Sequence, residues 1–160
     1  MDGISEILAT YNCVSLDEKI QFELDGVVEK EIKQAYCIEN LEFCVSCMDY
    51  TTLKVSDTEE SVKNFTADLL KKLKKFNLRD VAAVCVFSNY AGIVREGLKG
   101  TEIQTAVVAG NFPNSQTFTE IKLAECKMAI GAGAQEVDVV ISVGDILEKN
   151  YEKVYRELKA

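Results

Sequence analysis

The feature that most constrains the fold of this chain is a fourfold alternation of strand-like and helix-like segments that begins at residue 48. The predicted strands are 48–53, 81–87, 103–108 and 136–142, and helices are predicted at 56–75, 89–98, 118–130 and from 146 onward. The strands at 81–87 and 103–108 are almost continuously apolar, which is typical of strands covered on both faces. This alternation predicts βα units and a parallel sheet.

The length limits how far this pattern can extend. A complete (β/α)8 barrel needs roughly 200 residues or more, and the chain has 160. Residues 1–46 are predicted to form a helical extension, and residues 47–160 the sheet-containing part. Within the extension, a capping box at 15–18 predicts the start of a helix with one apolar face, formed by Ile20, Leu24, Val27, Val28 and Ile32.

The charge balance excludes several classes of function. The chain has 18 Lys plus Arg against 26 Asp plus Glu, a net charge of −8, and no histidine. Nucleic acids and anionic membranes both require a basic face, so neither is expected as a partner. The absence of histidine excludes imidazole as an acid, a base or a metal ligand. The basic run at 71–75 is predicted to lie at a helix C-terminus, where cations favour the macrodipole, and not to be a binding patch.

The cysteines and the apolar segments favour a cytoplasmic protein with reduced thiols. No signal peptide precedes the predicted elements, and no apolar run approaches the roughly 18 residues of a membrane span. The pair Cys44-x-x-Cys47 lacks a second pair with which to form a zinc site, and it precedes a strand-like segment. We therefore expect these two cysteines to be small buried hydrophobes.

The segment 136–141 carries the clearest chemical signal. Glu136 and Asp138 alternate with Val137 and Val139, so in a strand the carboxylates share one face and the valines the other. A carboxylate on an inner face is costly unless it is paired, so it is either a functional group or part of a structural ion pair. Both alternatives require a cationic partner, and no lysine or arginine lies inside a predicted strand.

Further candidates lie on the first two predicted strands. Asp49 and Thr51 belong to the first strand, and parallel α/β enzymes carry their active sites at the C-terminal ends of such strands. The β-branching of Thr51 also fits a purely structural role. Cys85 is a pocket thiol or a packing residue, and packing is favoured because no histidine could activate it. The Gly131-Ala132-Gly133 segment is predicted to end a helix, so it is not a phosphate loop.

Four stretches, in this order, resemble the deoxyribose-phosphate aldolases: MDYTTL at 48–53, VAAVCV at 81–86, AGNFP at 109–113 and GAGAQEVDVV at 131–140. The similarity covers residues 44–160, and Ser88 stands where the family usually has proline. The resemblance implies a class I aldolase with a (β/α)8 barrel. This chain then holds the first four βα units, half of the barrel, after an N-terminal helical extension.

The resemblance also implies a reaction and a site. The family cleaves 2-deoxy-D-ribose 5-phosphate reversibly to glyceraldehyde 3-phosphate and acetaldehyde through a lysine Schiff base, without a metal or other cofactor. It implies that Asp138 relays protons, that Asp49, Thr51 and Cys85 line the pocket, and that Phe112 forms part of its wall. The family's Schiff-base lysine and phosphate site lie on later strands. The chain is therefore expected to be a fragment that is inactive alone.

Two other hypotheses remain open. In the first, a non-catalytic half-barrel pairs with itself as a homo-oligomer or with a complementing C-terminal half, because its first and fourth strands have unpaired edges. In the second, an unrelated open sheet of four strands binds a small anion at the strand C-termini.

Overall fold

A computed structural model describes residues 13–160 of the chain, with the side chains of residues 19–28, 30–32 and 35–160. The chain divides into two units, of which the first ends at Leu41 and the second is Glu42–Ala160. The first twelve residues of the predicted helical extension lie outside the described residues. None of the described helices combines the length and apolar character that crossing a bilayer requires.

In the first unit, the described residues from Cys13 onward are mostly helical. It contains α2, Cys13–Ala35, and the beginning of α3, Ile38–Ser46. The predicted start at Ser15 is wrong, because α2 is already helical at Cys13 and a capping residue needs a non-helical backbone. The apolar face predicted for this helix is 46–59% exposed, and it comprises Ile20, Leu24, Val27, Val28 and Ile32.

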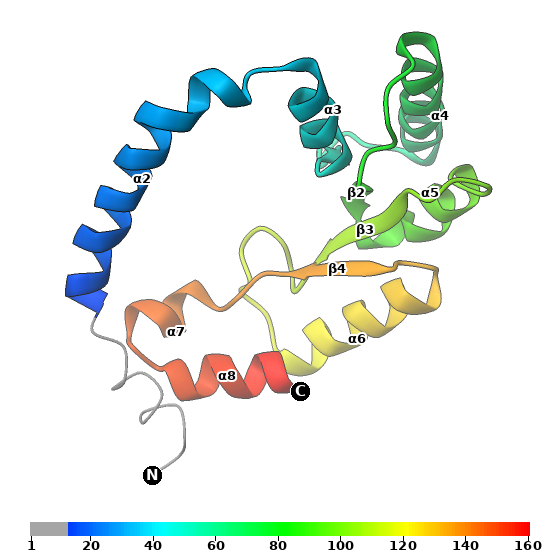
Figure 1. Ribbon diagram of the computed structural model, residues 1–160. Helices are drawn as coiled ribbons and strands as arrows, with labels where there is room; N and C mark the ends of the chain where they lie inside the picture. Colours follow the sequence, from blue (N-terminus) through cyan, green and yellow to red (C-terminus); the bar gives the residue numbers. More distant parts are fainter. Residues whose placement is uncertain (1–12) are drawn as a thin grey trace. The chain divides into compact units, whose positions relative to one another are not determined.

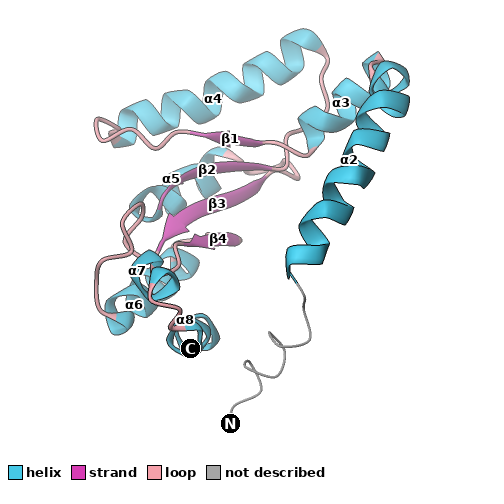
Figure 2. Cartoon of the chain, turned by 90° about the vertical axis from the view of Figure 1, so that its left-hand side faces the viewer, coloured by secondary structure: helices cyan, strands magenta, loops and turns pink. Residues whose placement is uncertain are grey.

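The second unit contains a four-stranded parallel sheet with the strands in sequence order (Figure 2). The strands are β1 (Asp49–Thr51), β2 (Ala83–Phe87), β3 (Gln104–Ala109) and β4 (Glu136–Val139). The predicted parallel sheet is therefore confirmed, and among the described residues β1 and β4 each have one neighbour. The helical elements, most of them labelled in Figure 1, are α4 (Glu59–Phe76), η1 (Ser88–Tyr90), α5 (Ala91–Gly97), α6 (Thr119–Gly131), α7 (Val143–Leu147) and α8 (Tyr151–Lys159).

The central strands β2 and β3 pack apolar side chains on both faces of the sheet, which explains their continuously apolar sequences. On the helix-covered face, buried residues of α4, α5 and α6 form one cluster with Val84, Val86 and Val107 of the central strands. On the opposite face, here called the inner face, a smaller cluster contains Ala83, Cys85, Ala106 and Val108, with Leu53 and Phe87 packed against it. The candidate residues of the strands lie on the inner face.

The start of α4 differs from the predicted one. Its N-cap is Thr58, whose hydroxyl accepts a hydrogen bond from the backbone N–H of Ser61 at 3.1 Å. The Ser61 hydroxyl accepts in return from the backbone N–H of Thr58 at 2.8 Å, which completes a capping box. The helix therefore begins later than the predicted start at residue 56. Its last turn carries Lys74 and Lys75, so the basic run does end a helix.

The predicted helix stop at Gly133 is confirmed, and the predicted final helix is two helices. Gly133 adopts φ +111°, and the N–H of Ala134 donates to the carbonyl of Ala129 at 3.0 Å, which closes α6. Beyond β4, Lys149 has φ +59° between α7 and α8. This left-handed residue interrupts the single helix expected from about 146, because a helix cannot continue through it.

Candidate active site

The inner face of the sheet gathers four of the five candidate residues. The strand register aligns Thr51 of β1 with Cys85 of β2, Ala106 of β3 and Glu136 of β4 in one row. Asp49 lies two residues before Thr51, and Asp138 two residues after Glu136, so their side chains share this face. The alternation predicted for 136–139 holds, since Val137 packs against the helix-side cluster.

Cys85 lies at the centre of this group and its thiol is held in the neutral form. Burial, followed by the negative charges of Asp138 and Asp49, raises the pKa of Cys85 to about 11. A hydrogen bond with Thr51 acts in the opposite direction but does not outweigh these effects. Because the thiolate is the nucleophilic form, this environment disfavours a nucleophilic role for Cys85, and its burial in the inner-face cluster favours a packing role.

The carboxylates of the inner face have no cationic partner in the part of the chain that the structure describes. No lysine or arginine there forms an ion pair with Asp49, Glu136 or Asp138. The strands themselves contain no basic residue. No ion pair with Asp138 therefore forms among the described side chains, and the negative charge of the inner face has no cationic partner among them.

Phe112 lies outside the sheet, in the loop between β3 and α6. Its ring meets that of Phe87 edge to face, with the ring centres 6.4 Å apart, so the aromatic pair joins the loop to the inner face. Glu125 of α6 fixes the same loop. Its carboxylate accepts hydrogen bonds from the backbone N–H groups of Gly110 and Asn111, both at 3.0 Å, and from the Ser88 hydroxyl at 2.8 Å.

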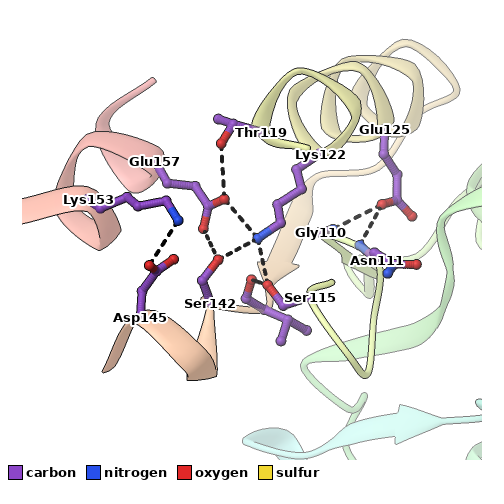
Figure 3. Close-up of polar contacts among 11 residues, drawn as sticks. Gly110, Asn111, Ser115, Thr119, Lys122, Glu125, Ser142, Asp145, Lys153 and Glu157 are labelled. Atoms are coloured by element: carbon purple, nitrogen blue, oxygen red, sulfur yellow. Dashed lines mark hydrogen bonds and ion pairs between the residues drawn. The ribbon is translucent and has the colours of Figure 1, made fainter. Parts of the chain in front are cut away.

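A buried lysine that the sequence analysis missed lies beside the C-terminal ends of β3 and β4. Lys122 of α6 is 2% exposed, and Figure 3 shows its ammonium group surrounded by polar atoms from three segments. It donates to the hydroxyls of Ser115 at 2.6 Å and Ser142 at 2.9 Å, and forms an ion pair with Glu157 of α8 at 2.8 Å. The Ser115 hydroxyl in turn donates to the carbonyl of Val140 at 2.9 Å.

This network is fully satisfied and joins distant parts of the chain. Glu157 also accepts from the hydroxyls of Ser142 and Thr119. Burial favours the neutral form of Glu157, but the hydrogen bonds from Lys122 and Ser142 and the charge of Lys122 outweigh it and lower the pKa of this carboxyl. Lys122 thus anchors the end of β4 and the helix α8, and it is not the missing partner of Asp138.

The cysteine pair differs from the expectation. Cys44 and Cys47 are exposed free thiols, so the expectation that they are buried is wrong. Within the described part of the chain, no group of three or more cysteine and acidic side chains is arranged to hold a metal ion.

The fold and the inner face together define the class of this protein. It is a parallel βα protein of the barrel type, and several carboxylates lie on the inner face of its sheet. No family model matches the sequence. Deoxyribose-phosphate aldolases do match it. That of Clostridium novyi is 42% identical over 113 residues, and that of Streptococcus sanguinis 35%. Each match covers 71% of this chain and 47% or 48% of the relative.

Solved structures agree with the sequence matches. A candidate deoxyribose-phosphate aldolase from Coccidioides immitis superimposes with a TM-score of 0.63 at 27% identity, over 72% of this chain and 43% of that one. A tetrameric deoxyribose phosphate aldolase from Aeropyrum pernix gives 0.56 at 28% identity, over 72% and 44%. The matched region is therefore related in sequence and in fold to the deoxyribose-phosphate aldolases, and the chain spans about half the length of these relatives.

Proposed function

We propose that this chain supplies the first four βα units of a deoxyribose-phosphate aldolase, an enzyme that reversibly cleaves 2-deoxy-D-ribose 5-phosphate to glyceraldehyde 3-phosphate and acetaldehyde. The observation that carries the proposal is the group of Asp49, Thr51, Cys85 and Asp138 on the inner face of a parallel sheet. The relationship to aldolases over 113 residues supports it. Residues 1–46 then form an extension outside the barrel half 47–160.

In this proposal Asp138 moves the proton of the reaction. Its carboxylate is exposed and lies on the same face as the neutral Cys85 thiol, so it is free to take a proton from a substrate carbon or hydroxyl and return it. Asp49 and Thr51 hydrogen-bond the sugar hydroxyls, and Phe112 forms part of the wall. A lysine amine from a complementing C-terminal half forms the Schiff base and neutralises the inner-face charge.

The proposal predicts that residues 1–160 alone are inactive, since no lysine lies on the strands of the described sheet. The chain is incubated with acetaldehyde and borohydride, and its intact mass is measured. We expect no adduct, and a stoichiometric adduct of reduced acetaldehyde would contradict the assignment of the amine to the other half.

The active form is tested by supplying that half. The chain is co-expressed with the part of the Clostridium novyi enzyme that lies beyond the matched region, and retro-aldol activity is measured on the purified pair. We expect activity in the pair, its loss in Asp138→Asn, and its retention in Asp80→Asn, which alters an exposed acid outside the sheet. Equal activity of the Asp138 variant would refute the proton-relay role.

Self-association is a second candidate function, favoured by the single neighbour of β1 and of β4. Two copies could join these edges into an eight-stranded barrel. However, this would enclose two sets of Asp49, Glu136 and Asp138 without a cation, which is electrostatically unfavourable. Light scattering separates the alternatives, since a stable dimer at neutral pH would favour self-association over a complementing half.

A further inference from the structure

A cavity of about 780 Å³ lies between α6, the loop after β3, and the segment that follows β2. None of the inner-face residues Asp49, Thr51, Cys85 and Asp138 lines it. Its volume falls in the range of about 300–1,000 Å³ that is typical of small-molecule sites. Of the five candidate active-site residues, only Phe112 lines it. The cavity is therefore distinct from the group around Asp138, with which it shares one wall.

The walls of the cavity are mostly apolar. On one side lie the rings of Phe87 and Phe112, in edge-to-face contact at 62°. On the other side, α6 presents Ile121 and Met128, which are 56% and 75% exposed. Large apolar side chains gathered around a hollow, and left accessible to water, are typical of a binding surface.

The charges and polar groups of the cavity restrict what can bind. Glu125 is its only ionisable lining residue, and both of its carboxylate oxygens already accept hydrogen bonds. The negative charge of Glu125 disfavours an anion, and a cation would have to compete with the three N–H and O–H donors that already occupy its oxygens. Asn89 and Asn111 also line the cavity, and within the described residues their side-chain amides form no hydrogen bond. These amides suit a ligand with neutral donors or acceptors.

A peptide strand is a poor occupant. The cavity adjoins β2 and β3, which are internal strands with a neighbour on each side. Their backbone groups are already paired, so no strand can add to the sheet there.

We propose that this cavity is a binding site for an uncharged small molecule, one with an aromatic or branched apolar body that fits between the phenylalanine pair and α6. A neutral hydroxyl or amide group of the ligand then meets the free amides of Asn89 and Asn111. The site does not depend on the proposed aldolase activity, because it lies wholly within residues 87–132.

The test uses the neutral fluorescent probe N-phenyl-1-naphthylamine, titrated into the purified chain. We expect saturable binding of one probe per chain, and weaker binding of its anionic relative 1-anilinonaphthalene-8-sulfonate. In the nuclear magnetic resonance spectrum, the Met128 methyl signal should shift and that of Met48, which does not line the cavity, should not. Non-saturable binding, or a shift of Met48 alone, would overturn the proposal.

Two variants locate the site. Ile121→Gln should weaken the probe about tenfold or more, which corresponds to about 1.4 kcal/mol. Leu158→Gln, a matched control on α8 with the same 56% exposure, should leave binding unchanged. Circular dichroism verifies that both variants are folded. An equal loss of probe affinity in both variants would show that the probe does not bind in the cavity. A dimer, detected by light scattering and dissociated by the probe, would show that a second copy of the chain occupies the cavity instead of a small molecule.

Discussion

At the scale of the residue, the ammonium group of Lys122 is the feature whose loss should be most costly. Lys122→Met leaves the Glu157 carboxylate largely buried without its cation, and removing one partner of a buried pair costs about 3–5 kcal/mol. Urea unfolding measures the loss. The control Lys153→Met removes a mostly exposed cation from Asp145, and should cost about 1 kcal/mol or less. Similar losses in both variants would contradict the assigned role of Lys122.

The cysteines should differ sharply in reactivity. At pH 8 the Cys85 thiol, whose pKa is raised to about 11, is almost wholly protonated and buried, whereas Cys44 and Cys47 are exposed. Alkylation by iodoacetamide, followed by peptide mass spectrometry, should label Cys44 and Cys47 rapidly and Cys85 only after denaturation. Rapid labelling of Cys85 in the folded chain would mean that the inner face does not hold its thiol neutral.

Sequence periodicity was sufficient for the residues of the inner face but not for Lys122. A period of two places Asp138 and Glu136 on one face whatever the strand packs against. The acceptors of Lys122 come from residues 115, 142 and 157, and no local pattern brings these together. One signal was present: Lys122 shares a helix face with Cys126 and Ala129, at spacings of four and three, and Ala129 is buried.

At the scale of the element, Gly110 determines how β3 turns into its loop. It has φ +80°, and an added Cβ would lie 3.1 Å from Cγ1 of Val139 and 3.2 Å from backbone atoms of Val140. Gly110→Ala should cost about 1–2 kcal/mol from the backbone alone, and more from these contacts. The control Gly144→Ala in α7 meets nothing within 4 Å, so it should be neutral or slightly stabilising in the same unfolding experiment.

The attachment of α8 should weaken in acid. The folded-state pKa of Glu157 is lowered, so its stabilising contribution is fully present above the unfolded value of about 4.5, and is lost as the pH falls through the lower folded value. The stability difference between the unaltered chain and Glu157→Gln should therefore be largest at neutral pH and shrink below pH 4.5. A difference independent of pH would show that the charge of Glu157 is not the source.

The sequence predicted the order of elements better than their ends. The alternation of strands rich in β-branched residues with polar helices is a property of whole segments, and the structure confirms it. The start of α4 depended on which residue forms the cap, and the cap is Thr58 paired with Ser61, two residues beyond the predicted start at 56. The break between α7 and α8 falls at Lys149, where the sequence has neither a glycine nor a proline to indicate that a helix ends.

At the scale of the whole molecule, the second unit should fold without the first. Both apolar clusters of the sheet are built entirely from residues at or beyond Val45. A chain of residues 42–160 should therefore retain a single cooperative urea transition and the circular dichroism of an α/β protein. If this shortened chain loses its cooperative transition, the helices before residue 42 take part in the core.

The sequential strand order has a kinetic consequence. Each strand pairs only with its neighbours in the sequence, so no pairing has to close a loop longer than one βα unit. Loop-closure entropy, which slows folds that are rich in distant contacts, is correspondingly small here. The sheet can then assemble strand by strand as the polypeptide emerges from the ribosome, with each new βα unit docking on the one made just before it.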